Sequence, residues 1–247
     1  MSSVYKVADF VLNDWGICAP GLHGRDGWGG FRLGARENAH AVPSIPDFIP
    51  KLQQRRLSPL ARLVFNAIDQ CLKPGETLPT VFSSAHGEVG KALEMLQMIQ
   101  AGEELSPTAF SLSVHNAIAG LYSIAYHNQQ EITVMAPGLD GLAPAFLEAL
   151  GLLQEGAGQV LVVLYDEPIA EFYPLAPFKL NAEFPCALAL RLSLSGEGMA
   201  LRLRRAPECL DDREQPVQLL PFIDFLLGDS AESGLIFEGR GWRWEII

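Results

Sequence analysis

The 247-residue sequence lacks the short motifs that mark several enzyme classes. It has no GxSxG, the nucleophile turn of many serine hydrolases. It has neither GxGxxG nor GxxxxGK followed by Ser or Thr, the glycine loops that hold dinucleotides and nucleoside triphosphates. Its five histidines form no HxH or HxxxH pair and its four cysteines no CxxC pair. We therefore expect no metal site and no cofactor.

Basic residues and long apolar runs are also scarce. The chain has 18 Lys and Arg against 29 Asp and Glu, a net charge of −11, which disfavours a nucleic-acid-binding role. No uncharged apolar segment approaches the ~18 residues of a membrane span, and no signal-peptide pattern opens the chain. Together with the widely spaced cysteines, these features predict a cytoplasmic protein.

What the chain does contain is enough apolar surface for a sizeable core. Hydrophobic residues make up 49% of the sequence, and no linker divides it, so we expect one domain over residues 1–247. Cys71 and Cys186 stand among apolar neighbours and are predicted to be buried thiols. Trp15 and Trp28 are predicted to be packing anchors.

Alternating apolar stretches and turn residues predict an α/β organisation. The first 50 residues, rich in Gly and Pro, are expected to be irregular. Ser58 and Pro59 start a helix whose apolar face runs to Leu72. A strand is predicted over 77–85. Helices are predicted over 89–101, from Pro107, and over 114–126.

A strand–turn–helix–strand unit follows at residues 132–167. ITVMA reads as a strand, Asp140 as the cap of the next helix, and QVLVVLYDE as a buried strand. The two strands are expected to be parallel. Beyond them we predict a β-hairpin over 186–206, a helix over 217–227 and a final short hairpin or edge strand over 234–247.

The turn of this unit is the site that bears most on function. Many α/β enzymes place a nucleophile there, but this turn offers Pro137, Gly138 and Leu139. Elsewhere, His86 follows a predicted strand and His115 begins a predicted helix, although a structural role is the commoner one for each. The pair Arg55 and Arg56 forms a small basic island in an acidic chain.

Three segments resemble β-ketoacyl synthases of the thiolase-like superfamily. They are TVFSSAHGEVGKALEMLQMI, LSPTAFSLSVHNAIAGLYSIA and ITVMAPGLDGLAPAFLEALGLLQEGAGQVLVVLYDEP. The second carries an SP…N…AG pattern that resembles a synthase segment near the dimer interface, formed by Ser106, Pro107, Asn116, Ala119 and Gly120. With IPDFIPKLQQRRLSPLARL, the match covers roughly residues 5–205. It is most similar to short ketosynthase-like proteins of aryl polyene and related polyketide clusters.

The resemblance implies a thiolase-like (ketosynthase) fold, mainly its N-terminal half, with layered α/β structure and a mostly parallel sheet. Synthases carry the acyl-accepting cysteine at the strand–turn–helix, where the alignment implies Gly138. Asp140 lies two residues on and is better explained as a helix cap. The HGTGT motif that carries a catalytic histidine in active synthases is missing. We therefore expect no catalytic residue in this chain.

The function implied is that of a chain-length-factor-like subunit, non-catalytic by itself, which pairs with an active β-ketoacyl-ACP synthase and shapes its acyl tunnel. The residues implied at the tunnel or partner interface are Thr108, Ala109, Phe110, Leu112, Val114 and Asn116. The acidic charge implies that acyl carrier protein docks mainly on the partner, with Arg55 and Arg56 as possible contacts. Two alternatives stay open: a thioesterase or decarboxylase that uses Asp140, His86 or His115, and a pure assembly scaffold.

Overall fold

The structure is a computed structural model that describes residues 5–28, 30, 44–73, 75–168, 182, 184–206, 219–228, 232–237 and 240–247. Its centre is one sheet whose strands follow the spatial order β4-β3-β5-β6-β1-β7-β9-β8, with short β2 paired to β1. The strands are β1 (Tyr5–Ala19), β2 (Leu22–His23), β3 (Thr80–Ser83), β4 (Ile132–Met135), β5 (Val160–Asp166), β6 (Cys186–Ser193), β7 (Met199–Ala206), β8 (Glu232–Phe237) and β9 (Arg240–Ile246).

The sheet is mixed, which corrects the expectation of a mostly parallel one. Only β3–β4 and β3–β5 are parallel pairs, and every other pair in the described sheet is antiparallel. As expected, the two strands of the 132–167 unit run parallel, but β3 lies between them. The α/β class itself is confirmed.

Strand β1 shows that two expectations were wrong, one about the first 50 residues and one about the hairpin over 186–206. Residues 5–19 form a fifteen-residue strand rather than an irregular segment. This strand also separates β6 from β7, so no hairpin forms over 186–206: Leu12 pairs with Leu192 on one side and Met199 on the other. Alternating apolar residues fit any antiparallel neighbour, which is why the local pattern cannot identify the partner strand. The last hairpin, β8–β9, is confirmed.

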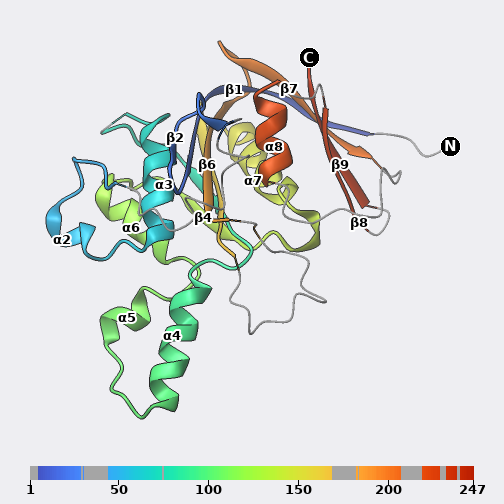
Figure 1. Ribbon diagram of the computed structural model, residues 1–247. Helices are drawn as coiled ribbons and strands as arrows, with labels where there is room; N and C mark the ends of the chain where they lie inside the picture. The colour runs from blue at the N-terminus through green and yellow to red at the C-terminus, as the bar shows by residue number, and fades with distance from the viewer. Residues whose placement is uncertain are drawn as a thin grey trace.

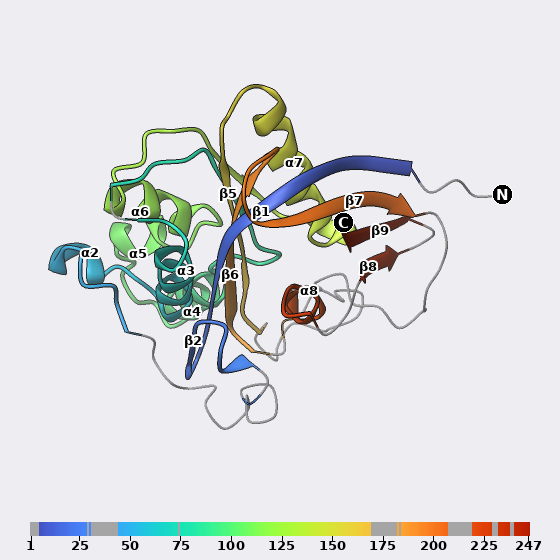
Figure 2. The ribbon, with the colours of Figure 1, turned by 90° about the horizontal axis from the view of Figure 1, so that it is seen from above.

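Helices cover both faces of the sheet (Figure 2). They are α2 (Lys51–Gln54), α3 (Pro59–Asp69), α4 (Val89–Gln100), α5 (Pro107–Ser111), α6 (Ala117–Ala125), α7 (Ala143–Gln154) and α8 (Leu219–Leu226), with a 3₁₀ turn η1 (Gly138–Asp140). Helices α3 and α6 pack on one face, α7 and α8 on the other. Strand β5 serves both: Val162 joins the α7 side and Val163 the α3 side, as alternation in a strand requires.

Helix α3 begins where its sequence signals place it. The Ser58 hydroxyl accepts a hydrogen bond from the Ala61 amide at 2.9 Å, and Pro59 occupies the first helical position. The helix ends at Asp69, earlier than its apolar pattern suggests. None of the helices among the described ranges combines the length and apolar character that a bilayer crossing demands.

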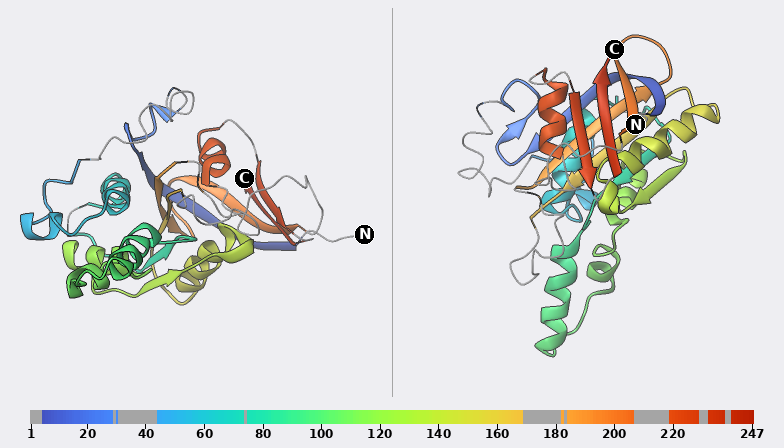
Figure 3. Two further views of the ribbon diagram at one scale, coloured as in Figure 1. Left: turned by 60° about the horizontal axis from the view of Figure 1, so that its bottom comes forward. Right: turned by 90° about the vertical axis from the view of Figure 1, so that its right-hand side faces the viewer.

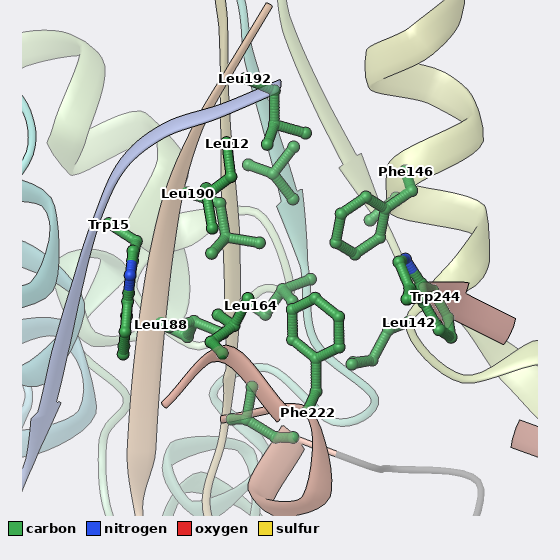
Figure 4. Packing of buried hydrophobic residues seen from close by; sticks show 14 of the residues in the cluster. Leu12, Trp15, Leu142, Phe146, Leu164, Leu188, Leu190, Leu192, Phe222 and Trp244 are labelled. Carbon is green, nitrogen blue, oxygen red and sulfur yellow. The ribbon is translucent and has the colours of Figure 1, made fainter. Parts of the chain in front are cut away.

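The larger core cluster lies between the sheet and helices α7 and α8. Phe146, Phe222 and Trp244 pack edge to face there, with ring centroids 5.4–5.5 Å apart (Figure 4). Trp15 and Trp28 are both buried in this cluster, as predicted. The Trp28 indole N–H also donates to Asp224 at 2.9 Å.

One part of the chain stands away from these layers. Helices α4 and α5 form a hairpin that projects from the body, as Figure 1 and the right-hand view of Figure 3 show. We call residues 89–111 the projecting hairpin. None of the residues of α4 or α5 is buried. A chain segment with this exposure gains little of its order from its own core.

Candidate functional site

The strand–turn–helix forms as predicted, but Asp140 does not cap the helix. Helix α7 begins at Ala143 after Leu142, which makes no side-chain cap. The Asp140 carboxylate instead accepts a hydrogen bond from the indole N–H of Trp242 at 3.0 Å. This aspartate therefore joins the turn to β9, a long-range contact that its sequence neighbours do not reveal.

Two glycines of this turn differ in the space around them. Gly138 is exposed, with φ +60°, and a Cβ there would meet no atom within 4 Å. Gly141 is buried, with φ 56° and ψ −126°, and it lines a cavity of about 10 Å³ together with Ser83, Leu164 and Asp166. Gly141 is therefore the buried glycine of this turn, and Gly138, which the resemblance implies at the cysteine position, is the exposed one. Neither residue provides a nucleophile.

The described thiols do not replace that nucleophile. Cys18, Cys71 and Cys186 are all buried, which confirms the prediction for the last two. Burial raises the pKa of Cys18 and of Cys71 to about 12, and it raises the pKa of Cys186 as well. These thiols stay protonated at neutral pH and are poor nucleophiles. Cys209 lies outside the described residues.

Of the two histidines raised as catalytic candidates, His115 binds the backbone through its ring, and His86 contributes its backbone amide to a hydrogen bond. The His115 ring donates through Nε2 to the Ser84 carbonyl at 2.8 Å, so that nitrogen does not serve as a base. The His86 amide donates to Asp166 at 3.2 Å. Within the described part of the chain, no group of three or more His, Cys, Asp or Glu residues could hold a metal ion.

The residues predicted at a tunnel or partner interface lie together on the projecting hairpin and its return to the body. Thr108, Phe110, Val114 and Asn116 are exposed, and Ala109 and Leu112 are half-buried. Phe110 exposes 61% of its surface, the most of any large apolar side chain among these six residues.

Sequence reasoning missed the apolar side chains on α4. Leu96 and Ile99 are 57% and 55% exposed, and Leu105 follows in the loop to α5. The sequence predicts a helix here but assigns no buried face to it, and only the position of the helix shows that these side chains meet no core. With Phe110 and Val114, these residues form what we call the apolar surface of the hairpin.

An acidic cavity lies at the root of the hairpin. It has a volume of about 420 Å³ and is lined by α3, the first turns of α4 and the end of β5. Its wall includes Glu88, Lys91 and Glu167. Burial, with the nearby charges of Glu88 and Asp166, raises the pKa of Glu167 to about 7. Arg55 and Arg56 are exposed at the end of α2.

Comparison with known proteins places the chain in a family. The family model for the N-terminal domain of β-ketoacyl synthases matches residues 32–245. The chain belongs to this family. A search of curated proteins found no match.

Solved structures of synthases and their complexes share the fold. A chain of the ketosynthase ApeO in complex with its chain length factor ApeC, from Xenorhabdus doucetiae, aligns with TM-score 0.75 and 24% identity over 97% of this chain and 100% of that one. The ishigamide ketosynthase/chain length factor aligns at 0.57 and 16%, over 83% and 69%. The complex AntDE:AntF, a type II acyl-carrier protein with its ketosynthase, aligns at 0.50 and 15%, over 78% and 59%. The predicted thiolase-like ketosynthase fold is confirmed.

Proposed function

We propose that this chain is the non-catalytic, chain-length-factor-like subunit of a heterodimeric β-ketoacyl-ACP synthase, as one cytoplasmic domain. The observation that carries the proposal is the projecting hairpin. Its helices α4 and α5 stand away from the body (Figure 1), and they carry the exposed side chains of Leu96, Ile99 and Phe110. Exposed apolar groups of this kind mark protein interfaces. The ketosynthase–chain length factor complexes that share this fold support a ketosynthase as the partner.

The strand–turn–helix supports a non-catalytic role. Active synthases need a thiolate at the turn, and both glycines there lack a side chain. The cysteine and histidines for condensation would come from the partner. In this proposal Ala109, Leu112 and Val114 form part of the wall of the acyl tunnel, and so limit product length in aryl polyene or related polyketide synthesis.

Because this chain is acidic, we expect the acyl carrier protein to dock mainly on the partner. Acyl carrier proteins are acidic, and this chain carries a net charge of −11, so the two repel at long range. Arg55 and Arg56 are exposed neighbours and are the basic pair that we propose to test as a contact. Carrier-protein affinity of the complex should fall in the double variant Arg55→Glu and Arg56→Glu if they form a contact, and stay unchanged if they do not.

The first test is co-expression with the ketosynthase encoded nearest to this chain, followed by native mass measurement. We expect a one-to-one complex whose condensation activity disappears when the partner's cysteine is replaced. A chain that remains alone with every ketosynthase tested contradicts the proposal. So does thioester hydrolysis by the isolated chain that is lost in Asp140→Ala, which would indicate an independent enzyme.

A second test separates a tunnel wall from a pure scaffold. Ala109→Trp adds a large side chain to a half-buried position and should shorten the products of the assembled complex. The control is Leu147→Trp, at an exposed position on α7 away from the hairpin, which should leave product length unchanged. Identical product lengths from both variants would support a scaffold instead.

A further inference from the structure

The projecting hairpin joins the body through two short connections. Residues 84–88 lead out from β3, and residues 112–116 return to α6. Because none of the residues of its helices is buried, the hairpin depends for its direction on these two connections and on the contacts at its root. The contacts that hold them therefore decide where the apolar surface of the hairpin points.

A buried carboxylate holds the outgoing connection. Asp166, the last residue of β5, accepts hydrogen bonds from the Ser84 hydroxyl at 2.8 Å, the Ala85 amide at 3.0 Å and the His86 amide at 3.2 Å. The Ser84 hydroxyl in turn accepts from the Gly87 amide at 2.7 Å. Two successive amides and one hydroxyl thus close around the Asp166 carboxylate, which restricts the conformations open to this loop.

His115 ties the returning connection to the outgoing one. Its ring N–H donates to the Ser84 carbonyl, the residue that also bonds Asp166. The ring packs on Gly87, where φ is +56° and an added Cβ would lie 2.9 Å from the His115 Cδ2 atom. Gly87 is needed there both for its backbone conformation and for the space that the imidazole occupies.

A second bridge crosses the root of the hairpin from the other side. The Glu88 side chain is 3% exposed, accepts from the Ser58 hydroxyl at 2.5 Å and pairs with Lys91 at 3.2 Å. The Lys91 ammonium also reaches the Leu112 carbonyl at 3.5 Å. Helix α3, the start of α4 and the end of α5 are thereby linked through two side chains.

We propose that Asp166 and His115 are positioning residues, which fix the direction of the projecting hairpin and so prepare its apolar surface for the ketosynthase. The effect on ketosynthase binding rests on the proposed function, whereas the contacts that orient the hairpin do not. If a loosened hairpin holds the binding direction in about a tenth of the molecules, the apparent Kd rises about tenfold. The apolar contacts themselves remain unchanged.

The direction of the hairpin is measurable in the isolated chain. Spin labels can be attached at Glu103→Cys, near the hairpin tip, and at Glu155→Cys, after α7, in a chain in which Cys209 is replaced by serine. Double electron–electron resonance then measures the distance between the hairpin and the body. Both label sites are exposed. We expect one narrow distance distribution for the otherwise unchanged chain.

Two matched variants decide the role of His115. His115→Leu removes the N–H donor, and His115→Gln keeps one. We expect a broad distribution and an approximately tenfold weaker Kd for the ketosynthase in His115→Leu, with both restored to within about twofold in His115→Gln. Asp166→Asn should broaden the distribution too, since its amide turns a donor toward backbone donors. The His115 pair keeps the test valid if Asp166→Asn does not fold.

Two results would overturn the inference. One is a distribution in His115→Leu as narrow as that of the unchanged chain. The other is a broadened distribution with an unaltered Kd. A chain that binds no ketosynthase at all counts against the proposed function, while the distance measurement still shows whether His115 orients the hairpin.

Discussion

Replacing Glu167 with glutamine should stabilise the chain at alkaline pH and leave it unchanged at acid pH. Glu167 follows β5 and lines the acidic cavity at the root of the hairpin. Its burial, Glu88 and Asp166 together raise its pKa from 4.5 to about 7, against the opposing effect of Lys91. Ionising this carboxylate is therefore harder in the folded chain than in the unfolded one.

The sign of the pH dependence follows directly. Below pH 4.5 the carboxyl is neutral in both states and costs nothing. Between 4.5 and 7 the unfolded chain ionises first, so the free energy of unfolding falls as pH rises, and above 7 the full penalty remains. The pKa difference corresponds to a ceiling of about 3 kcal/mol. Because the side chain is partly exposed, water reduces this to about 1–2 kcal/mol.

Denaturant unfolding at pH 4 and pH 8 measures the effect. Glu167→Gln should match the unchanged chain at pH 4 and exceed it by about 1–2 kcal/mol at pH 8, or about 3–6 °C in Tm. The control Glu155→Gln, at an exposed site after α7, should show no such difference between the two pH values. An equal effect of Glu167→Gln at both pH values would refute the electrostatic reasoning.

Three further tests address other parts of the molecule. Gly141→Ala should destabilise the chain by about 2–3 kcal/mol and Gly138→Ala by about 1, because both need positive φ but only Gly141 is buried; denaturation of the pair measures this. Phe146→Ala should cost about 3–5 kcal/mol in the same assay, since its ring is fully buried. Leu96→Glu should weaken ketosynthase binding at least tenfold by calorimetry while stability changes by less than about 0.5 kcal/mol, whereas Leu147→Glu should leave binding unchanged. Equal binding by the two glutamate variants would remove α4 from the interface.

Elements with strong local signals could be predicted from the sequence. Helix α3 has its Ser58 cap, its proline and an apolar face, and it starts at the expected residue. Strand β5 is short, apolar and buried along its whole length, as a strand covered on both faces should be. In these segments the local signal and the tertiary environment agree.

Pairing between distant strands could not be predicted in the same way. Residues 186–206 alternate as a hairpin would, but β1 occupies the place between the two strands. Nothing near either strand indicates a partner some 180 residues away, because alternation specifies which face is buried and leaves the neighbour open. In the same way, the Trp242 indole of β9 donates a hydrogen bond to Asp140, so the prediction that Asp140 caps the next helix was wrong.

In the candidate site, too, the local features could be predicted from the sequence and the features that depend on packing could not. The sequence alone indicates a strand–turn–helix without a nucleophile, since no side chain at 137–139 could serve. It does not distinguish Gly138 from Gly141, because exposure and ψ depend on how the turn packs against β3 and β5. The network of Ser84, His115 and Asp166 joins three separate segments and has no sequence signature.

Helix α4 shows why an apolar periodicity by itself does not identify a core. Its pattern is amphipathic, as that of a core helix is, yet none of its residues is buried. A face that is apolar and unburied costs solvation free energy unless another surface covers it, so its presence argues for a partner. The polar contacts at its root, which we propose fix its direction, agree with this account, because docking on a partner needs a defined direction. Together, these two features make association with a second subunit the most economical account of the projecting hairpin.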